Sequence, residues 1–260
     1  MRTKFGQNFL VNNAIADKIV QSLQITANDT IIEIGPGKGI LTSRILTKKP
    51  EKLIAIELDR NLISNLIKKF GNDTRIELLN TDFMDYDLSR ISSGTPVKFI
   101  ANLPYYISTV ILNKVLSYTN WDISVFMFQK EVADRILAKP DNKQYGILTL
   151  ITRLHVKNIE LIIPKISPDS FSPSPEIYSS VLQFTKIEHP YTLEQISKFT
   201  KFVQASFQSR RKTIANCLSK TTKFTKQEII EILNKNGISS NSRPENITFQ
   251  QYMLLSNILI

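Results

Sequence analysis

The sequence predicts an α/β protein with a mostly parallel sheet, followed by a small all-helical domain. Short apolar runs alternate with amphipathic helical patterns in the first two thirds of the 260 residues, which is typical of a parallel sheet covered by helices. After about Lys186 the texture becomes helical throughout. The composition, with 42% apolar and 22% charged residues, excludes wholesale disorder. We therefore expect domains at 1–186 and 187–260.

Strand-like and helical patterns alternate through the first domain. Apolar, β-rich runs occupy Thr30–Ile34, Lys52–Glu57, Arg75–Leu79, Val97–Ala101 and Ile123–Phe128. Helices are expected over about 40–47, 59–70 and 108–118, and after the fifth run to about 138. Asp59 is expected to cap the second helix. Two later runs, near 159–163 and 178–184, are joined by a proline-rich loop and are expected to close the sheet as a hairpin.

The tail contains three helix-start signals of the capping-box type. They are Thr192-Leu-Glu-Gln195, Thr225-Lys-Gln-Glu228 and Thr248-Phe-Gln-Gln251, and each precedes a helical apolar pattern. Gly237 is well placed to end the second of these helices.

The net charge of +10, from 33 basic and 23 acidic residues, suggests a polyanionic partner. The charge is uneven, because residues 184–260 hold 11 basic and 5 acidic residues. The pattern alone is equally compatible with a solvated helical surface.

Cysteine and histidine are scarce. Cys217 is the single cysteine, which excludes an intramolecular disulfide and a cysteine-based zinc cluster. His155 and His189 are too few for a histidine-rich metal site or a Ser-His-Asp site, so we expect no metal. No run reaches the ~18–20 apolar residues of a membrane helix, and the N-terminus lacks the apolar core of a signal peptide. We expect a cytoplasmic protein with no membrane partner.

A glycine-rich turn, Gly35-Pro-Gly-Lys-Gly39, follows the first strand. Ligands of open α/β sheets bind at the carboxyl ends of strands, and glycines there let a ligand approach backbone N–H groups. The spacing departs from G-x-G-x-x-G, and Lys38 is followed by Gly39 rather than by the Ser or Thr of a P-loop. On its own the segment is also compatible with a simple turn.

Acidic residues end the next two strands. Glu57 can accept hydrogen bonds from the ribose hydroxyls of a nucleoside, and Asp82 from an adenine amine, with Phe83 packing on the ring. Alternatively, Glu57 or Asp59 simply caps the following helix and Asp82 is a loop aspartate; we favour ribose binding for Glu57 and capping for Asp59. Together these strand ends indicate an adenosine-containing ligand without a pyrophosphate, and S-adenosylmethionine fits that description.

Asn102-Leu-Pro-Tyr105 follows the fourth strand and is the most specific motif. An adenine amine is a poor nucleophile because its lone pair is delocalised into the ring. Acceptors on Asn102 and on the backbone carbonyl of Leu103 can hold both N–H groups and free that lone pair for attack on a sulfonium methyl. Pro104 fixes the backbone, and Tyr105 offers a stacking face. The alternative is a turn with a buried tyrosine.

Two further segments are candidates for the same site. Phe171-Ser-Pro-Ser-Pro175 is a stiff loop whose phenylalanine could face Tyr105 across a base, or could simply be buried. In Phe5-Gly-Gln-Asn-Phe-Leu10, Gln7 and Asn8 could cover the methionine end of the cofactor, although the residues alone indicate only an N-terminal arm.

Taken together, these residues resemble the ribosomal RNA adenine dimethyltransferases of the KsgA (or RsmA) family. The resemblance spans nearly the whole chain. It rests on ordered motifs at the family's spacing: Gly6–Leu10, Glu33–Gly39, Glu57–Asp59, Asp82, Asn102–Tyr105, Gln129–Val132, Tyr145–Gly146, Phe171–Pro175 and Phe207–Thr213.

The resemblance implies an S-adenosylmethionine-dependent (Rossmann-like) methyltransferase fold, with a seven-stranded sheet containing one antiparallel strand. It implies dimethylation of the N6 amines of two adjacent adenosines in the 3′-terminal hairpin of small-subunit (16S) rRNA, in a pre-assembled small subunit, and a role in subunit biogenesis. It implies cofactor contacts by Asn8, Leu10, Gly35, Glu57, Asp82 and Asn102. It implies that the target base is held by Asn102, Leu103, Tyr105 and Phe171.

Further expectations follow from the resemblance. Arg210, Arg211 and Lys212 are assigned to RNA phosphate contact, with helix capping or a domain interface as the alternative. We expect a monomer that binds the immature small subunit and does not bind DNA. Tyr106 and Ala101 depart from the family's usual Asn and Gly. Neither change removes a catalytic group, although Tyr106 could reshape the pocket rim and so affect the second methylation.

Two other functions remain open. The Erm branch, which methylates large-subunit rRNA, shares several of these motifs, although Leu103 and Arg210-Arg-Lys-Thr213 favour KsgA. A non-enzymatic nucleic-acid-binding factor on the same fold is the other alternative. The site residues that argue against it are all intact: Asn102, Tyr105, Glu57 and Asp82.

Overall fold

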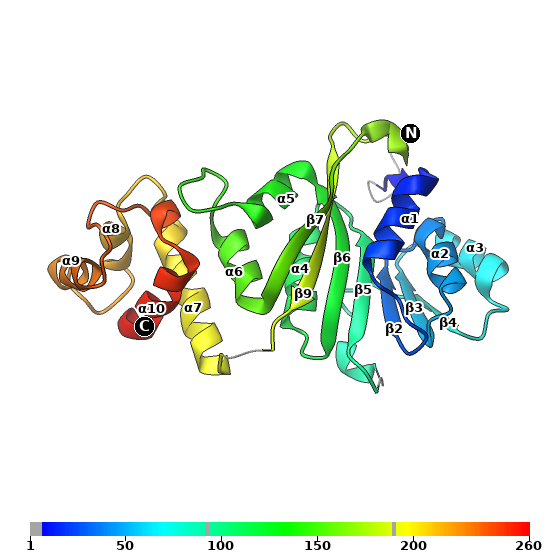
Figure 1. Cartoon of the computed structure of the whole chain (residues 1–260), viewed down its shortest axis with the longest axis horizontal. Coiled ribbons are helices and arrows are strands. Elements are labelled where there is room, and N and C mark those ends of the chain that lie inside the picture. The colour runs from blue at the N-terminus through cyan, green and yellow to red at the C-terminus, as the bar shows by residue number, and fades with distance from the viewer. Residues whose placement is uncertain (1–6, 92–93, 189–190) are drawn as a thin grey trace. The chain divides into compact units, whose positions relative to one another are not determined.

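The computed structural model describes residues 7–91, 94–188 and 191–260 (Figure 1). Phe5, Gly6 and His189, named above, lie outside these ranges. Internal contacts divide the chain into two compact units, Met1–Ala133 with Val156–Ile187, and Asp134–His155 with Glu188–Ile260. The junction between Ile187 and Glu188 lies one residue from the domain boundary that the sequence predicts after residue 186. The segment 134–155, which the sequence assigns to the sheet domain, belongs by its contacts to the helical unit.

The first unit contains a seven-stranded sheet in the order β4-β3-β2-β5-β6-β9-β7. The strands are β2 (Thr30–Ile34), β3 (Lys52–Glu57), β4 (Ile76–Asn80), β5 (Val97–Asn102), β6 (Trp121–Gln129), β7 (Val156–Ile166) and β9 (Ser179–Lys186). β9 runs antiparallel to both of its neighbours, and the four pairs from β4 to β6 are parallel. The mostly parallel α/β fold is confirmed, and the two late strands pair with each other as predicted.

Helices and short turns connect these strands. The helices are α1 (Asn13–Ser22), α2 (Ile40–Thr47), α3 (Arg60–Phe70), α4 (Ser108–Ser117) and α5 (Lys130–Leu137), with 3-10 turns at Leu88–Arg90 and Pro168–Ser170. The side chain of Asp59 caps α3, because its Oδ1 accepts from the N–H of Asn61 at 2.8 Å. The expected cap is confirmed.

Helices cover both faces of the sheet. On β5, Ile100 joins the apolar cluster that includes Ile19 of α1 and Ile45 of α2. The adjacent residue Phe99 points the other way and packs edge-on against Phe83 and Tyr118. This alternation is the two-residue period of a strand that is buried on both faces.

A separate two-stranded sheet ties the N-terminal arm to the proline loop. β1 (Phe9–Leu10) pairs antiparallel with β8 (Phe171–Ser172), with Leu10 opposite Phe171. This pairing is not predictable from the local sequence pattern, because each strand has only two residues.

The second unit is helical. It contains α6 (Ile147–His155), α7 (Leu193–Ser206), α8 (Ile214–Leu218), α9 (Lys226–Lys235) and α10 (Phe249–Leu259), with 3-10 turns at Phe207–Ser209 and Pro244–Asn246. The capping boxes begun by Thr192, Thr225 and Thr248 all form. Gly237 follows α9 with φ +69°, as a helix-ending glycine does.

The core of the helical unit is rich in aromatic rings. Phe199, Phe202 and Tyr252 are fully buried there, and Tyr252 stacks on Phe207 at 6.1 Å between ring centroids. None of the helices in the described ranges combines the length and the apolar character that a membrane crossing requires.

Candidate functional site

A pocket opens at the carboxyl ends of the parallel strands. Ile34, the last residue of β2, pairs with Ile56 of β3 and with Ala101 of β5, so the segments that leave these strands are adjacent. Eight of the nine residues assigned to the site from sequence line this pocket: Asn8, Leu10, Gly35, Glu57, Asp82, Asn102, Leu103 and Tyr105.

The glycine turn forms one wall. Gly35 has φ +65° and its N–H donates to the carbonyl of Ile56 at 2.9 Å. A Cβ added at Gly35 would meet no atom within 4 Å, so the backbone there borders open space. A Cβ at Gly37 would lie 3.0 Å from the Phe9 ring, which shows how closely the N-terminal arm covers the turn.

Glu57 joins the second strand to the glycine turn. Its Oε2 accepts from the N–H of Gly37 and its Oε1 from the N–H of Asp59, both at 3.0 Å. The side chain is buried, and that burial raises the pKa of Glu57, although the two backbone N–H groups oppose the shift. The carboxylate is therefore held in one orientation at the pocket wall.

Glu33 also lines the pocket, although it was not among the site residues predicted from sequence. Thr42 Oγ1 donates to its Oε2 at 2.7 Å, whereas Oε1 is buried and has no hydrogen-bond partner in the described chain. Burial raises its pKa to about 8. A carboxylate inside the apolar run Thr30–Ile34 was the available signal.

Asp82 and Phe83 form the wall beyond β4. Asp82 Oδ1 accepts from the N–H of Met84 at 2.8 Å, so one carboxylate oxygen closes the turn and the other is the one a ligand would meet. Phe83 is buried and packs edge-on against Phe99, with ring centroids 6.4 Å apart.

Asn102 and Tyr105 are fixed by contacts from distant parts of the chain. Asn102 Nδ2 donates to the backbone carbonyl of Asn8 at 3.0 Å. Because the nitrogen end of the amide is used, the oxygen end remains as the acceptor. The Tyr105 hydroxyl lies 2.7 Å from Ser179 Oγ, and burial raises its pKa.

The structure does not bring Phe171 to the pocket. Its side chain is 4% exposed and belongs to the apolar cluster on the α1–α2 side of the sheet, because the pairing with Leu10 turns it into the core. The expected arrangement, with Phe171 facing Tyr105, is therefore absent from this structure. Tyr106, in contrast, is 71% exposed at the pocket rim.

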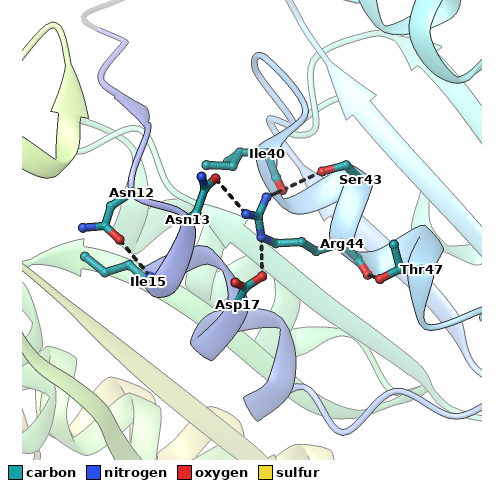
Figure 2. Close-up of polar contacts among 8 residues, drawn as sticks. All are labelled: Asn12, Asn13, Ile15, Asp17, Ile40, Ser43, Arg44 and Thr47. Carbon is teal, nitrogen blue, oxygen red and sulfur yellow. Dashed lines mark hydrogen bonds and ion pairs between the residues drawn. The ribbon is translucent and has the colours of Figure 1, made fainter.

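Arg44 links α1, the helix after the N-terminal arm, to α2, the helix after the glycine turn (Figure 2). From α2, its Nη2 donates to Asn13 Oδ1 at 2.8 Å and its Nε to Asp17 Oδ1 at 2.6 Å, both on α1. Its Nη1 donates to the Ile40 carbonyl at 2.9 Å. The N-terminal arm leads directly into α1, and the glycine turn leads into α2. The hydrogen bonds of Arg44 therefore help to fix these two segments relative to each other.

The pocket fits a cofactor that carries adenosine and a charged amino-acid tail. Carboxylates at two strand ends can accept from ribose and adenine, open space borders Gly35, and an unpaired Glu33 oxygen is buried in the lining. The fold and the site define an S-adenosylmethionine-dependent methyltransferase.

Comparisons with known proteins identify the family. The chain matches the ribosomal RNA adenine dimethylase family over residues 1–260, and it belongs to that family. It is similar to ribosomal RNA small subunit methyltransferase A of Ehrlichia ruminantium, with 39% identity over 99% of this chain and 97% of the relative. The same-named protein of Clostridioides difficile is 39% identical over 98% of this chain and 89% of its own length.

Solved structures agree with the fold. A dimethyladenosine transferase from Plasmodium falciparum matches with a TM-score of 0.80 at 24% identity, covering 96% of this chain and 98% of that one. The 23S rRNA methyltransferase ErmE matches with a TM-score of 0.76 at 20% identity, covering 97% and 99%. The chain is thus an rRNA adenine dimethyltransferase that uses S-adenosylmethionine.

Proposed function

We propose that this enzyme dimethylates the N6 amines of two adjacent adenosines in the 3′-terminal hairpin of small-subunit rRNA. The substrate would be a pre-assembled small subunit, and the reaction a step of its biogenesis in the cytoplasm. The names of the 37–39% identical relatives support the choice of subunit. The enzyme would act as a monomer and would not bind DNA.

The observation that carries the proposal is the hydrogen bond from Asn102 Nδ2 to the Asn8 carbonyl. It leaves Asn102 Oδ1 as an acceptor for one N–H of the adenine amine, and the backbone carbonyl of Leu103 would accept the other. Two acceptors in these positions favour a pyramidal nitrogen whose lone pair is available for in-line attack.

Tyr105 would orient the base. Its hydroxyl is tied to Ser179, which fixes the ring as a stacking face for an extruded adenine. No strong base is needed before transfer, because the amine proton becomes acidic only when the nitrogen already carries the methyl group, and it then leaves to water. After the first transfer one N–H remains, so one of the two acceptors still holds the monomethylated amine for the second transfer.

The cofactor would be held by Asn8, Leu10, Gly35, Glu57, Asp82 and Asn102. S-adenosylmethionine supplies an electrophilic methyl group on sulfur. Glu57 would accept from the ribose hydroxyls and Asp82 from the adenine amine, and Phe83 would pack on the ring. The N-terminal arm, held by Asn102 and by its pairing with β8, would exclude water from the reacting end.

RNA contact would fall mainly on residues 187–260. Arg211 and Lys212 are exposed, whereas Arg210 Nη2 donates to the carbonyls of Lys143 and Tyr145 at 2.7 and 2.8 Å. Within this basic run we assign phosphate contact to Arg211 and Lys212, and an anchoring role to Arg210.

The test supplies labelled S-adenosylmethionine to undermethylated small subunits, large-subunit rRNA and adenine-rich DNA, and then maps the label. Dimethyladenosine in the small-subunit 3′ hairpin is the expected product. Label in large-subunit rRNA alone would favour the Erm-type alternative, and transfer to none of the substrates would overturn the proposal.

A further inference from the structure

Lys114 lies on α4, the helix that begins just after the Asn102–Tyr105 motif, and its side chain reaches the loop after β4. Its Nζ donates to the backbone carbonyls of Phe83 at 2.7 Å, Met84 at 2.8 Å and Tyr86 at 2.7 Å. An ammonium has three N–H donors, so this one loop uses all of them. The same Nζ lies 5.0 Å from the centroid of the Phe83 ring.

Three carbonyl dipoles that converge on one point repel each other, and the Lys114 ammonium between them offsets that repulsion. Asp82 closes the opposite side of the same loop. Its Oδ1 accepts from the N–H of Met84, and its backbone carbonyl accepts from the N–H groups of Asp85 and Tyr86. The loop is therefore bounded by Asp82 on the pocket side and by Lys114 on the α4 side. Removal of the ammonium would leave three partly buried carbonyls without their shared donor.

The electrostatic surroundings keep this ammonium in place. Burial lowers the pKa of Lys114, and the nearby carboxylates of Asp85, Asp82 and Asp87 oppose that shift. The cation is thus attracted by the acidic loop that it organises.

We propose that Lys114 is a positioning residue for the adenosine half of the cofactor site. It fixes the loop that presents Asp82 and Phe83, and it links that loop to the helix that follows the target-base motif. The assignment rests on the proposed role of Asp82 in adenine recognition. Asp82 and Phe83 line the pocket and Lys114 does not, so its effect would pass through the position of those two residues.

The test measures the affinity of the full chain for S-adenosylhomocysteine by calorimetry. Lys114→Met keeps the aliphatic stem and removes the ammonium, and we expect its dissociation constant to rise about 10- to 100-fold. Lys68→Met, which removes an exposed lysine of α3, is the matched control and should bind like the wild type. The KM for S-adenosylmethionine should rise with the dissociation constant, while the KM for the RNA substrate stays unchanged.

A double-mutant cycle separates positioning from general stabilisation. If Lys114 acts through the loop, Lys114→Met should weaken binding much less in an Asp82→Asn background than in the wild type. Equal losses in both backgrounds, or unchanged affinity in a folded Lys114→Met variant, would overturn the proposal. If Lys114→Met does not fold, Lys114→Gln replaces it. Wild-type affinity in that variant would equally overturn the proposal, because a neutral amide with two N–H donors cannot replace the ammonium at three carbonyls. Failure of the wild type to bind S-adenosylhomocysteine would instead contradict the proposed function.

Discussion

The side chain of Asn102 and the main chain of Asn8, 94 residues apart in sequence, are joined by a 3.0 Å hydrogen bond. The bond fixes which end of the Asn102 amide faces the pocket. It also places the N-terminal arm against the residue that we assign to the target amine.

Asn102→Ala should reduce turnover by about 100-fold or more, because loss of one aligned polar group at a reacting centre commonly has that effect. RNA affinity should stay within about threefold of the wild type, since Ala keeps the backbone and the tail is untouched. Single-turnover rates and filter binding measure the two quantities. Asn113→Ala, at an exposed site on α4, is the control, and near-normal turnover in Asn102→Ala would contradict the amine-positioning mechanism.

Glu57→Gln should weaken S-adenosylhomocysteine binding by about tenfold, because an amide nitrogen cannot accept from a ribose hydroxyl. Burial raises the pKa of Glu57, so its carboxylate is lost at a higher pH than for an exposed glutamate. Cofactor affinity of the wild type should therefore increase as the pH rises through that pKa, and Glu57→Gln should abolish this increase. Calorimetry across the pH range tests both points, with exposed Glu51→Gln as the control.

Glu33 should make the protein less stable as the pH rises. Its folded-state pKa of about 8 lies above the ordinary value of 4.5, so between these values the folded state holds a proton that the unfolded state releases. The free energy of unfolding should fall through this window, with a slope of up to about 1.4 kcal/mol per pH unit. Glu33→Gln should remove this contribution to the slope in urea titrations. An unchanged slope would show that Glu33 is charged in the folded protein.

Arg211→Ala combined with Lys212→Ala should weaken RNA binding and reduce the slope of log affinity against log salt by about two. Turnover at saturating RNA should change little.

Arg210→Ala should instead lower the free energy of unfolding by about 1 kcal/mol, because it removes the hydrogen bonds to the Lys143 and Tyr145 carbonyls. If Arg210→Ala weakened RNA binding without any loss of stability, the division of roles within this run would be wrong.

Arg44→Met should lower the free energy of unfolding by about 1 kcal/mol, mostly through the lost bonds to Asn13 and the Ile40 carbonyl (Figure 2). Asp17→Ala should have a smaller effect, since the Asp17 side chain is 65% exposed and solvent screens its ion pair. Thermal unfolding at low and high salt tests the difference. A loss of stability for Asp17→Ala as large as that for Arg44→Met would contradict this ranking.

Much of the fold could be predicted because its signals are local. The bounds of the strands at Thr30–Ile34 and Lys52–Glu57 agree with the structure, since each is a compact apolar run next to a turn or cap. The cap at Asp59 depends on residues within one helical turn, as do the capping boxes of the tail. The sequence also predicted which strand ends carry polar groups, and the parallel register brings those ends together.

The features that were missed depend on distant contacts. The pairing of Leu10 with Phe171 joins two-residue strands from opposite parts of the chain, and so short a strand has no periodicity to detect. Lys114 gave no signal either, because its partners are backbone carbonyls, which every residue has. The position of Phe171 follows from the same pairing with Leu10.

The discontinuity of the helical unit has a consequence for synthesis. Leu150 and Leu154 of α6 are fully buried in a core completed by Phe199 of α7 and Tyr252 of α10. Since chains emerge from the ribosome N-terminus first, α6 leaves the exit tunnel well before the helices that cover it. The nascent protein therefore passes through a stage in which its sheet can form while the apolar face of α6 is still exposed, and at that stage it should depend most on chaperones.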